Sequence, residues 1–388
     1  MRGVAAVNAI AGVRRRRQIL VLGNGAAGAE KQALALASKL QLFLPSHENV
    51  SVAMCRVPYA TRLHASLPPI AHVFLARCSL DPWIGYASFI PTSPPDVVIG
   101  CGRSTVALCA GFKQAFPSVF NIQIQHPRVN LRYFDAVVAP FHDFPSTMSQ
   151  HGRPPPSNVH LTPGTVCDIS RASLASARQA WLDDPSSWAH LPSPKIAVLV
   201  GGSCRGYSFT LDRAAALVAH LSRHAATATF LITFSRRTPP PVMRFLQRAF
   251  ALFPSVYIWD NQSPNPFMGF LAHAAAIVAT PDSISMVTEA IASGMPTFVC
   301  DSHLTTGKFE RFHRQVSPWV ADVASLDVSS SSSLQKDPRP TSQTDPSCPL
   351  VPSPEQLAMD HGVVDAVGGA VAAFWDQHPQ DTKDMHSQ

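Results

Sequence analysis

The sequence has little charge and no long hydrophobic run, and both absences limit what the protein can be. Only 14% of the 388 residues are charged, against 46% that are hydrophobic, which is typical of a globular α/β protein with many buried strands. No apolar stretch approaches the roughly 18 to 20 residues that a membrane span needs, so we expect peripheral membrane contact at most. The net charge of +6 is modest and comes partly from residues 14–17, which argues against a nucleic-acid partner.

Patterns that hold disulfides or metals are also missing. The eight cysteines form no C-x-x-C pair, so we expect reduced thiols, with Cys101 and Cys109 in the core. The sixteen histidines form no H-E-x-x-H motif, and no D-x-D pair is present. We therefore predict no metal site.

Residues 1–17 contain five arginines and no acidic residue. Organellar targeting segments share this composition, but here the apolar part precedes the arginines, which reverses the order of a secretory signal. Two interpretations stay open. One is mitochondrial import or attraction to a surface, and the other is a disordered basic tail.

Strand-like and helical segments alternate along two halves of the chain, which predicts βαβ units and two mostly parallel sheets. Proline-rich polar residues 183–194 separate the halves, and a later tract with five consecutive serines cannot bury enough apolar surface to fold. Predicted strands span 18–22, 50–54, 96–100, 119–124, 135–139, 195–200, 228–234, 256–259, 276–280 and 296–300, and predicted helices span 30–40, 104–116, 211–225, 241–253 and 283–293. The predicted parts are a basic tail (1–17), two Rossmann-like domains (18–185 and 186–324), a disordered loop (325–353) and a helix (354–377).

The stretch from residue 276 to residue 301 reads as strand, polar turn, helix and second strand. Asp282, Ser283 and Ser285 lie where the helix begins, and unpaired N–H groups with the positive end of the helix dipole favour an anion there. Glu289 follows Ser285 by one helical turn and could accept hydrogen bonds from sugar hydroxyls. The alternative is that Ser283 only caps the helix and Glu289 faces water.

Three glycine turns follow predicted strands, as the first turn of a nucleotide-binding unit requires. They contain Gly28, the pair Gly100 and Gly102 with Arg103, and the pair Gly201 and Gly202. No acidic residue lies at the carboxyl end of a strand about 20 residues after the first turn, so the sequence gives little support for a dinucleotide site. Many α/β proteins use such turns only for packing.

Polar side chains also gather after two other strands. Gln125, His126 and Arg128 end one strand, and Arg236 with Arg237 follows another. Because open α/β sheets bind ligands at strand carboxyl ends, these are site candidates, and the arginines could hold a diphosphate. A histidine bonded to a backbone carbonyl and a solvated arginine loop are the alternatives.

Several segments, in this order, resemble the plant elongated-mitochondria fission-factor family and its bacterial relatives. The resemblance covers roughly residues 18–315. It begins at Gly28, Glu30 and Gln32. The further segments are VVIGCGRSTVAL, IQIQHPR, FDAVVAPFHD, AVLVGGSCRGYSFT, TFSRRTPP, WDNQSPNPFMGFLAHA, ATPDSISMVTEAIASGMPTFV and KFERFHRQ.

The resemblance implies a glycosyltransferase-B-like fold, with two Rossmann-like domains facing across a cleft. Plant members of the family act from the cytosol at the mitochondrial outer surface and help to recruit a dynamin-related GTPase for division. Bacterial members have no assigned role and are often supposed to bind nucleotide-sugars.

Two hypotheses follow. The first is a mitochondrial fission factor on an inherited scaffold, with a dynamin-related GTPase as partner. The second is a glycosyltransferase using a nucleoside-diphosphate sugar, with no other cofactor and with His126 or Asp143 as the base. The expected ligand-binding residues are Gly28, Glu30, Gln32, Gly100, Gly102, Arg103, Gln125, Arg128, Gly201, Gly202, Arg236, Arg237, Asp282, Ser283, Ser285 and Glu289.

Overall fold

The computed structural model describes residues 16–23, 25–44, 49–79, 81–87, 94–144, 155–327 and 361–378. Contacts between Cα atoms divide the chain into two compact units. Unit 1 has residues 1–123, 127–135 and 367–388, and unit 2 has residues 124–126 and 136–366, so the expected boundary at residue 185 lies within unit 2. Most of the expected basic tail and serine-rich loop, and the expected helix start at residue 354, lie outside the described residues.

Six strands form the first sheet, and their apolar sequences explain why. The runs VVIGC, FNIQI and AVVAP are buried at every residue, as in strands covered by helices on both faces. Five strands were predicted from the sequence, and the short segment VHLT was not. The strands are β1 (Arg17–Gly23), β2 (Val50–Arg56), β3 (Val97–Cys101), β4 (Phe120–Ile124), β5 (Ala136–Pro140) and β6 (Val159–Thr162).

The strands of this sheet lie in the order β2-β1-β3-β4-β5-β6. Strand β1 pairs in parallel with β2 and with β3, and β5 pairs in parallel with β6. Helix α1 (Ala27–Phe43) follows β1 and helix α4 (Val106–Ala115) follows β3, as the alternating pattern predicts. Two further helices between β2 and β3, α2 (Arg62–Ser66) and α3 (Pro69–Cys78), were not predicted.

The second sheet also has six strands, and five of them were predicted. The two-residue edge strand was not, because it is too short to show an alternation. The strands are β7 (Lys195–Val200), β8 (Thr229–Phe234), β9 (Val256–Ile258), β10 (Ala276–Ala279), β11 (Thr297–Val299) and β12 (Ala321–Asp322). The helices are α6 (Arg171–Leu182), α7 (Leu211–Ser222), α8 (Pro240–Phe250), α9 (Phe267–His273), α10 (Ile284–Ala292) and α11 (Lys308–Val316).

The strand order of the second sheet is β12-β11-β10-β7-β8-β9, and all five pairings are parallel. The first strand, β7, therefore lies in the middle, with β8 and β9 on one side and the later strands on the other. This is the strand order of the Rossmann fold. The predicted helices α7, α8 and α10 are present, whereas α6, α9 and α11 were not predicted.

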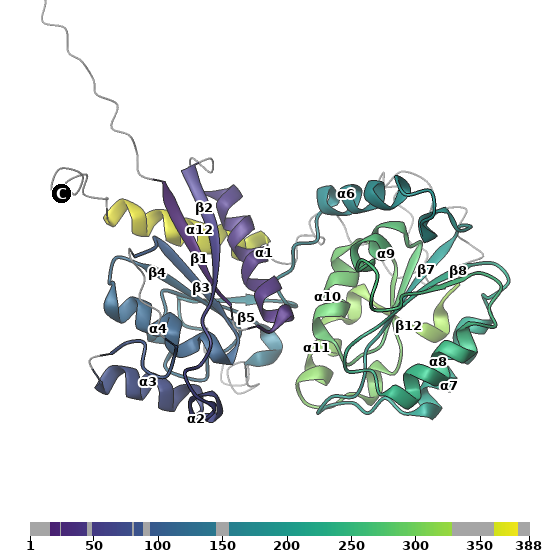
Figure 1. The fold of residues 1–388 in the computed structure, drawn as a ribbon, viewed down its shortest axis with the longest axis horizontal. Coiled ribbons are helices and arrows are strands. Elements are labelled where there is room, and N and C mark those ends of the chain that lie inside the picture. Colours follow the sequence, from purple (N-terminus) through teal and green to yellow (C-terminus); the bar gives the residue numbers. More distant parts are fainter. Residues whose placement is uncertain are drawn as a thin grey trace, which may run out of the picture. The chain divides into compact units, whose positions relative to one another are not determined.

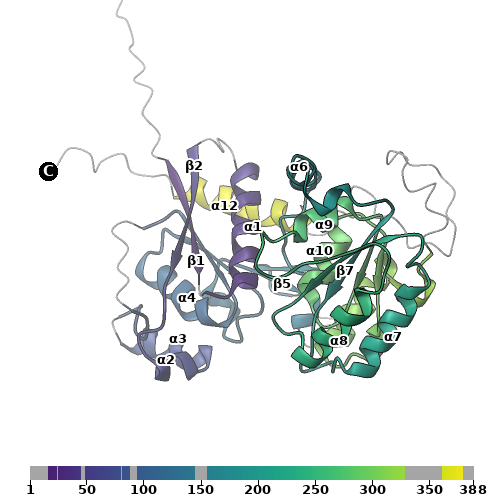
Figure 2. The same ribbon diagram turned by 45° about the vertical axis from the view of Figure 1, so that its right-hand side comes forward.

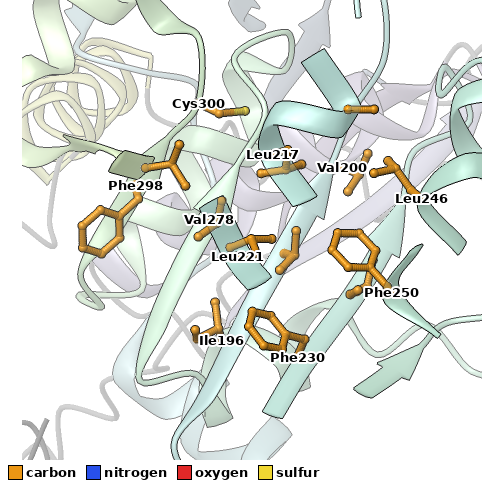
Figure 3. Close-up of a cluster of buried hydrophobic side chains, with 14 of the residues drawn as sticks. Ile196, Val200, Leu217, Leu221, Phe230, Leu246, Phe250, Val278, Phe298 and Cys300 are labelled. Carbon is orange, nitrogen blue, oxygen red and sulfur yellow. The ribbon is translucent and has the colours of Figure 1, made fainter. Parts of the chain in front are cut away.

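Both faces of the second sheet are buried. On one face, Ile196 and Phe230 pack in a cluster with Leu217 of α7 and Phe250 of α8 (Figure 3). On the other face, alternate residues of β7 and β10 pack with residues of α9, α10 and α11. Burial on both sides explains why these strands read as continuous apolar runs.

Residues 367–377 of the last helix, α12 (His361–Gln377), belong to unit 1, and the helix ends where the sequence predicts. It lies beside β1 and α1 (Figures 1 and 2). The Arg17 guanidinium lies 4.0 Å from the centroid of the Trp375 ring. A Cβ atom at Gly368 would lie 2.2 Å from the Phe43 ring, so a larger residue there would displace that ring. The first unit is thus built from both ends of the described chain.

Within the described ranges, no helix is long and apolar enough to cross a membrane. The seven cysteines of those ranges are free, and Cys101 and Cys109 are buried, as predicted. Packing, and not a cross-link between these thiols, therefore holds the described elements together.

Candidate functional site

Each sheet has one point where successive strands are added on opposite sides, and open α/β sheets bind ligands at the strand carboxyl ends beside such a point. In the first sheet it lies between β1 and β3, which the turns at Gly25 and Gly102 follow. In the second it lies between β7 and β10, which Gly201 and Asp282 follow. The glycine turns singled out in the sequence therefore lie at the two positions where this fold class binds ligands.

A buried carboxylate joins three strand ends in unit 2. The Asp282 side chain is fully buried, and its oxygens accept hydrogen bonds from the Gly202 N–H at 2.8 Å and the Thr280 hydroxyl at 2.7 Å. Arg237, which follows β8, places a guanidinium nitrogen 3.1 Å from the same carboxylate. The structure thus brings together the predicted residues Gly202, Arg237 and Asp282.

The close approach of these turns explains both glycines of the Gly201–Gly202 pair. A Cβ atom at Gly201 would lie 1.9 Å from an Asp282 carboxylate oxygen, and one at Gly202 would lie 2.0 Å from the Arg237 carbonyl oxygen. The Thr280 hydroxyl also accepts a hydrogen bond from the Gly201 N–H at 2.7 Å. Packing of the chain against itself therefore requires glycine here, whether or not a ligand approaches.

Helix α10 begins at the predicted turn. Ser283 is its N-cap, and its hydroxyl accepts a hydrogen bond from the Met286 N–H at 3.4 Å, so Ser283 does cap the helix. Glu289 is only 7% exposed, so the expectation that it faces water is wrong. Ser285 lies half-buried in the first turn of the helix.

His313 of α11 holds the same turn from its other side. Its Nε2–H donates to the Pro281 carbonyl at 2.8 Å. Burial lowers the pKa of His313, although this hydrogen bond opposes the shift, and the ring is neutral near pH 7. His313 was not predicted, although KFERFHRQ is one of the segments of the family resemblance, and that was the available signal.

The two arginines after β8 differ in their surroundings. Arg236 is exposed. Arg237 is about half exposed, but its guanidinium pairs with the Asp282 carboxylate and donates to the Asp282 carbonyl at 3.4 Å. A diphosphate clamp by both arginines would have to share Arg237 with Asp282.

Glu30 holds the first glycine turn of unit 1. One of its oxygens accepts a hydrogen bond from the Gly25 N–H at 2.8 Å, and both pair with the Arg56 guanidinium at 2.9 and 2.7 Å. Gln32 donates to the Gly28 carbonyl at 3.2 Å. The predicted residues Gly28, Glu30 and Gln32 therefore lie together, with Arg56 as an unpredicted partner.

The second glycine turn of unit 1 is also braced from within. Arg103 donates to the backbone carbonyls of Ser66 and Leu67, at the end of α2, at 3.2 and 2.8 Å. A Cβ atom at Gly100 would lie 2.9 Å from a side-chain oxygen of Gln123, which donates to the Gly102 carbonyl at 3.2 Å.

The two proposed bases lie in one neighbourhood of unit 2. The His126 ring packs on the Phe144 ring with centroids 4.6 Å apart, and Asp143 precedes Phe144 in the 3-10 helix η4 (Phe141–Asp143). Gln125 and Arg128 flank His126 and adopt positive φ angles of 68° and 59°. Such backbone costs energy in residues other than glycine and gathers at functional sites.

Beside Asp143, the structure adds residues that the sequence did not point to. His142 is buried, with Nε2 3.8 Å from an Asp143 oxygen. Arg311 of α11 donates to the His142 carbonyl at 2.9 Å, and the Phe312 ring lies edge-on to the imidazole. These contacts hold η4 against α11.

Across the residues that the structure covers, no group of three or more His, Cys, Asp or Glu side chains could hold a metal ion. One histidine pair has helical spacing, His220 and His224. Helix α7 ends at Ser222, and the His220 Nδ1 lies 2.6 Å from a guanidinium nitrogen of Arg223. The two imidazoles therefore do not form a pair of metal ligands on one helix face.

Comparison with known proteins identifies the family. Residues 27–318 match the family described as Mitochondrial fission ELM1. The chain belongs to this family. It is 35% identical over 238 residues to the mitochondrial fission protein ELM1 of Arabidopsis thaliana, covering 57% of this chain and 55% of that protein. It is 28% identical over 233 residues to the uncharacterized protein RP120 of Rickettsia prowazekii (strain Madrid E), covering 53% of this chain and 64% of that protein.

Each of these matches spans less than two thirds of the relative's own length. Among solved structures, the chain is similar to UDP-GlcNAc 2-epimerase from Neisseria meningitidis bound to UDP-GlcNAc, with 15% identity, TM-score 0.46 and coverage of 94% and 100%. It is also similar to a putative UDP-N-acetylglucosamine 2-epimerase from Listeria monocytogenes. That match has 10% identity and a TM-score of 0.47, and it covers 77% of this chain and 82% of that structure. The assignment of this ELM1-family chain to the α/β class rests on its own two sheets.

Substitution at Gly201 tests whether the close approach of Asp282 explains the glycine. We expect Gly201→Ala to lower the free energy of unfolding by about 2 kcal/mol or more, because the new methyl group overlaps the carboxylate. In an Asp282→Ser background the loss should shrink by about 1 kcal/mol or more, measured as a double-mutant cycle in urea. Gly28→Ala is the matched control, since a Cβ there meets no atom within 4 Å. Equal losses in both backgrounds would contradict this explanation.

Protonation of His142 should make the free energy of unfolding depend on pH. Burial lowers the pKa of His142 to about 4, helped by Lys308, Arg311 and His313 and opposed by Asp143. Between about pH 6.5 and about pH 4 the unfolded chain binds this proton and the folded chain does not, so stability falls as pH falls through that window. In His142→Gln, urea unfolding at stepped pH should show a shallower fall. An unchanged slope would rule out His142 as the source.

Proposed function

We propose that the chain is a mitochondrial fission factor that acts at the mitochondrial surface and recruits a dynamin-related GTPase. Membership of the Mitochondrial fission ELM1 family, with 35% identity to the Arabidopsis protein of that name, supports the role in fission. The GTPase partner is what the family resemblance implies. On this proposal the glycosyltransferase-B-like fold serves as a scaffold.

One observation favours a scaffold over catalysis. At the carboxyl edge of β7 and β10, three of the groups expected to meet an anionic ligand, Gly202, Arg237 and Asp282, are bonded to one another. The Asp282 carboxylate already takes the Gly202 N–H and pairs with Arg237. A diphosphate at this turn would face a buried negative charge and would compete with Asp282 for these donors.

The fission role predicts a phenotype that does not depend on the proposed catalytic residues. Loss of the protein should elongate mitochondria, measured as organelle length in the cells that produce it. The chain carrying His126→Ala and Asp143→Asn should restore normal length, and it should co-precipitate a dynamin-related GTPase as the wild type does. Normal organelles after loss, or rescue by the wild type only, would count against the scaffold.

The position of the glycine turns favours a second function, a glycosyltransferase that uses a nucleoside-diphosphate sugar. The turns of unit 2 lie beside β7 and β10, where Rossmann-type folds bind nucleotides. The diphosphate would lie at the start of α10 near Ser283 and Ser285, with Arg236 as the exposed cation. Glu289 would bind the ribose, and His126 or Asp143 would take the proton from the acceptor hydroxyl.

Thermal unfolding with nucleotides tests this second function. A nucleoside diphosphate at 100 times its dissociation constant should add about 2.7 kcal/mol to the stability of the folded chain. We expect one of the uridine, guanosine or cytidine diphosphates to raise the melting temperature, and Arg236→Gln to reduce that rise. Leu252→Gln, at a site 84% exposed, is the control. If none of the three diphosphates raised the melting temperature, the glycosyltransferase would be ruled out and the scaffold would remain as the proposed function.

A further inference from the structure

The helices α2 and α3 of unit 1 expose large apolar side chains. Leu63 of α2 is 70% exposed, and Ile70 and Phe74 of α3 are 62% and 65% exposed. We call these three residues the α2–α3 patch. Single exposed apolar residues are common on proteins, but three on two short adjoining helices form a candidate interaction surface.

The geometry of α3 places two of these side chains on one outward stripe. Its buried residues are Pro69, His72, Val73 and Ala76, which form the inward face. Ile70 and Phe74 are four residues apart and therefore share a face, and Arg77 continues the same stripe after another three. Figures 1 and 2 both show α2 and α3 side by side at the same end of unit 1.

The two helices are fixed in place, so the patch is presented without rearrangement. Arg103 bonds the last carbonyls of α2. The His64 ring of α2 stacks on the His72 ring of α3, with centroids 5.9 Å apart. The apolar side chains therefore project from a braced surface, which lowers the ordering cost of binding.

Two exposed cations belong to the helices that carry the patch. Arg62 of α2 and Arg77 of α3 are exposed, and the Arg77 guanidinium lies 4.8 Å from the centroid of the Tyr133 ring. Residues 49–95 contain one further arginine, Arg56, which pairs with Glu30. The acidic residue of that range is Asp81, which follows α3 by three residues, is exposed and accepts a hydrogen bond from the Trp83 N–H.

We propose that the α2–α3 patch is a docking surface for an anionic lipid bilayer. Leu63, Ile70 and Phe74 would enter the boundary between headgroups and acyl chains, while Arg62 and Arg77 would bind lipid phosphates. Apolar side chains beside exposed arginines fit such a bilayer, because it offers apolar depth beneath a negative surface. The inference follows from exposure and charge alone and does not depend on a role in fission.

Vesicle co-sedimentation of the full chain tests the proposal. Vesicles of phosphatidylcholine and phosphatidylglycerol in equal amounts should bind the wild type, and vesicles of phosphatidylcholine alone should bind it much less. The double variant Ile70→Ser and Phe74→Ser should bind about tenfold more weakly or worse, because it loses two apolar side chains. Arg62→Gln should weaken binding by about fivefold at low salt, and added salt should reproduce that loss.

Leu252→Ser is the matched control, because Leu252 is 84% exposed in unit 2. It should bind vesicles like the wild type. Unchanged melting temperatures would show that both variants are folded, as expected for exposed positions. Three results would overturn the proposal. They are no binding of the wild type to either kind of vesicle, binding of the double variant as strong as that of the wild type, and a loss in Leu252→Ser equal to that in the double variant. So would a wild-type dimer that the double variant converts to a monomer, since the patch would then join two copies. No GTPase is in the assay, so its outcome is independent of the fission role.

Discussion

One buried carboxylate organises the polar edge of unit 2. Asp282 has no exposed side-chain surface, and a charge removed from water costs free energy unless donors surround it. The donors come from Gly202, Thr280 and Arg237, which follow or end β7, β10 and β8. Residues at separate points of the sequence therefore depend on a single charge, and the glycines are required because the chain must approach it closely.

The same edge is where an α/β sheet of this strand order binds ligands, so the two demands compete. A nucleotide-binding turn needs backbone N–H groups and cations that are free to meet a phosphate. Here one such N–H and the better placed arginine meet Asp282 instead. In unit 1, Glu30 occupies the Gly25 N–H and pairs with Arg56 in a similar way. Internal carboxylates at both edges are the physical basis for our proposal that the fold serves as a scaffold and not as a glycosyltransferase.

The hydrophobic residues of unit 1 fall into two groups, those buried in its core and those exposed on α2 and α3. Most are buried beneath or between helices, as the burial of β3 and β4 shows. Those of α2 and α3 that face outward contribute nothing to that core, and the same two helices carry the exposed arginines Arg62 and Arg77. Sequence patterns did not reveal this surface, because α3 is apolar on both faces and has no amphipathic signature.

The sequence by itself determined the α/β class, ten of the twelve described strands and the glycine turns, since buried parallel strands are continuous apolar runs that need no knowledge of their neighbours. It also placed Ser283 at the start of α10. Short elements such as β12 were out of reach, because two residues carry no periodicity.

Only the tertiary structure decided which polar groups meet. It joined Asp282 to Gly202 and Arg237, Glu30 to Arg56, and His313 to the Pro281 carbonyl. These partners lie between 26 and 80 residues apart in the chain. Local propensity does not encode such distances, and a side chain becomes a ligand site or a structural brace according to what the fold places beside it.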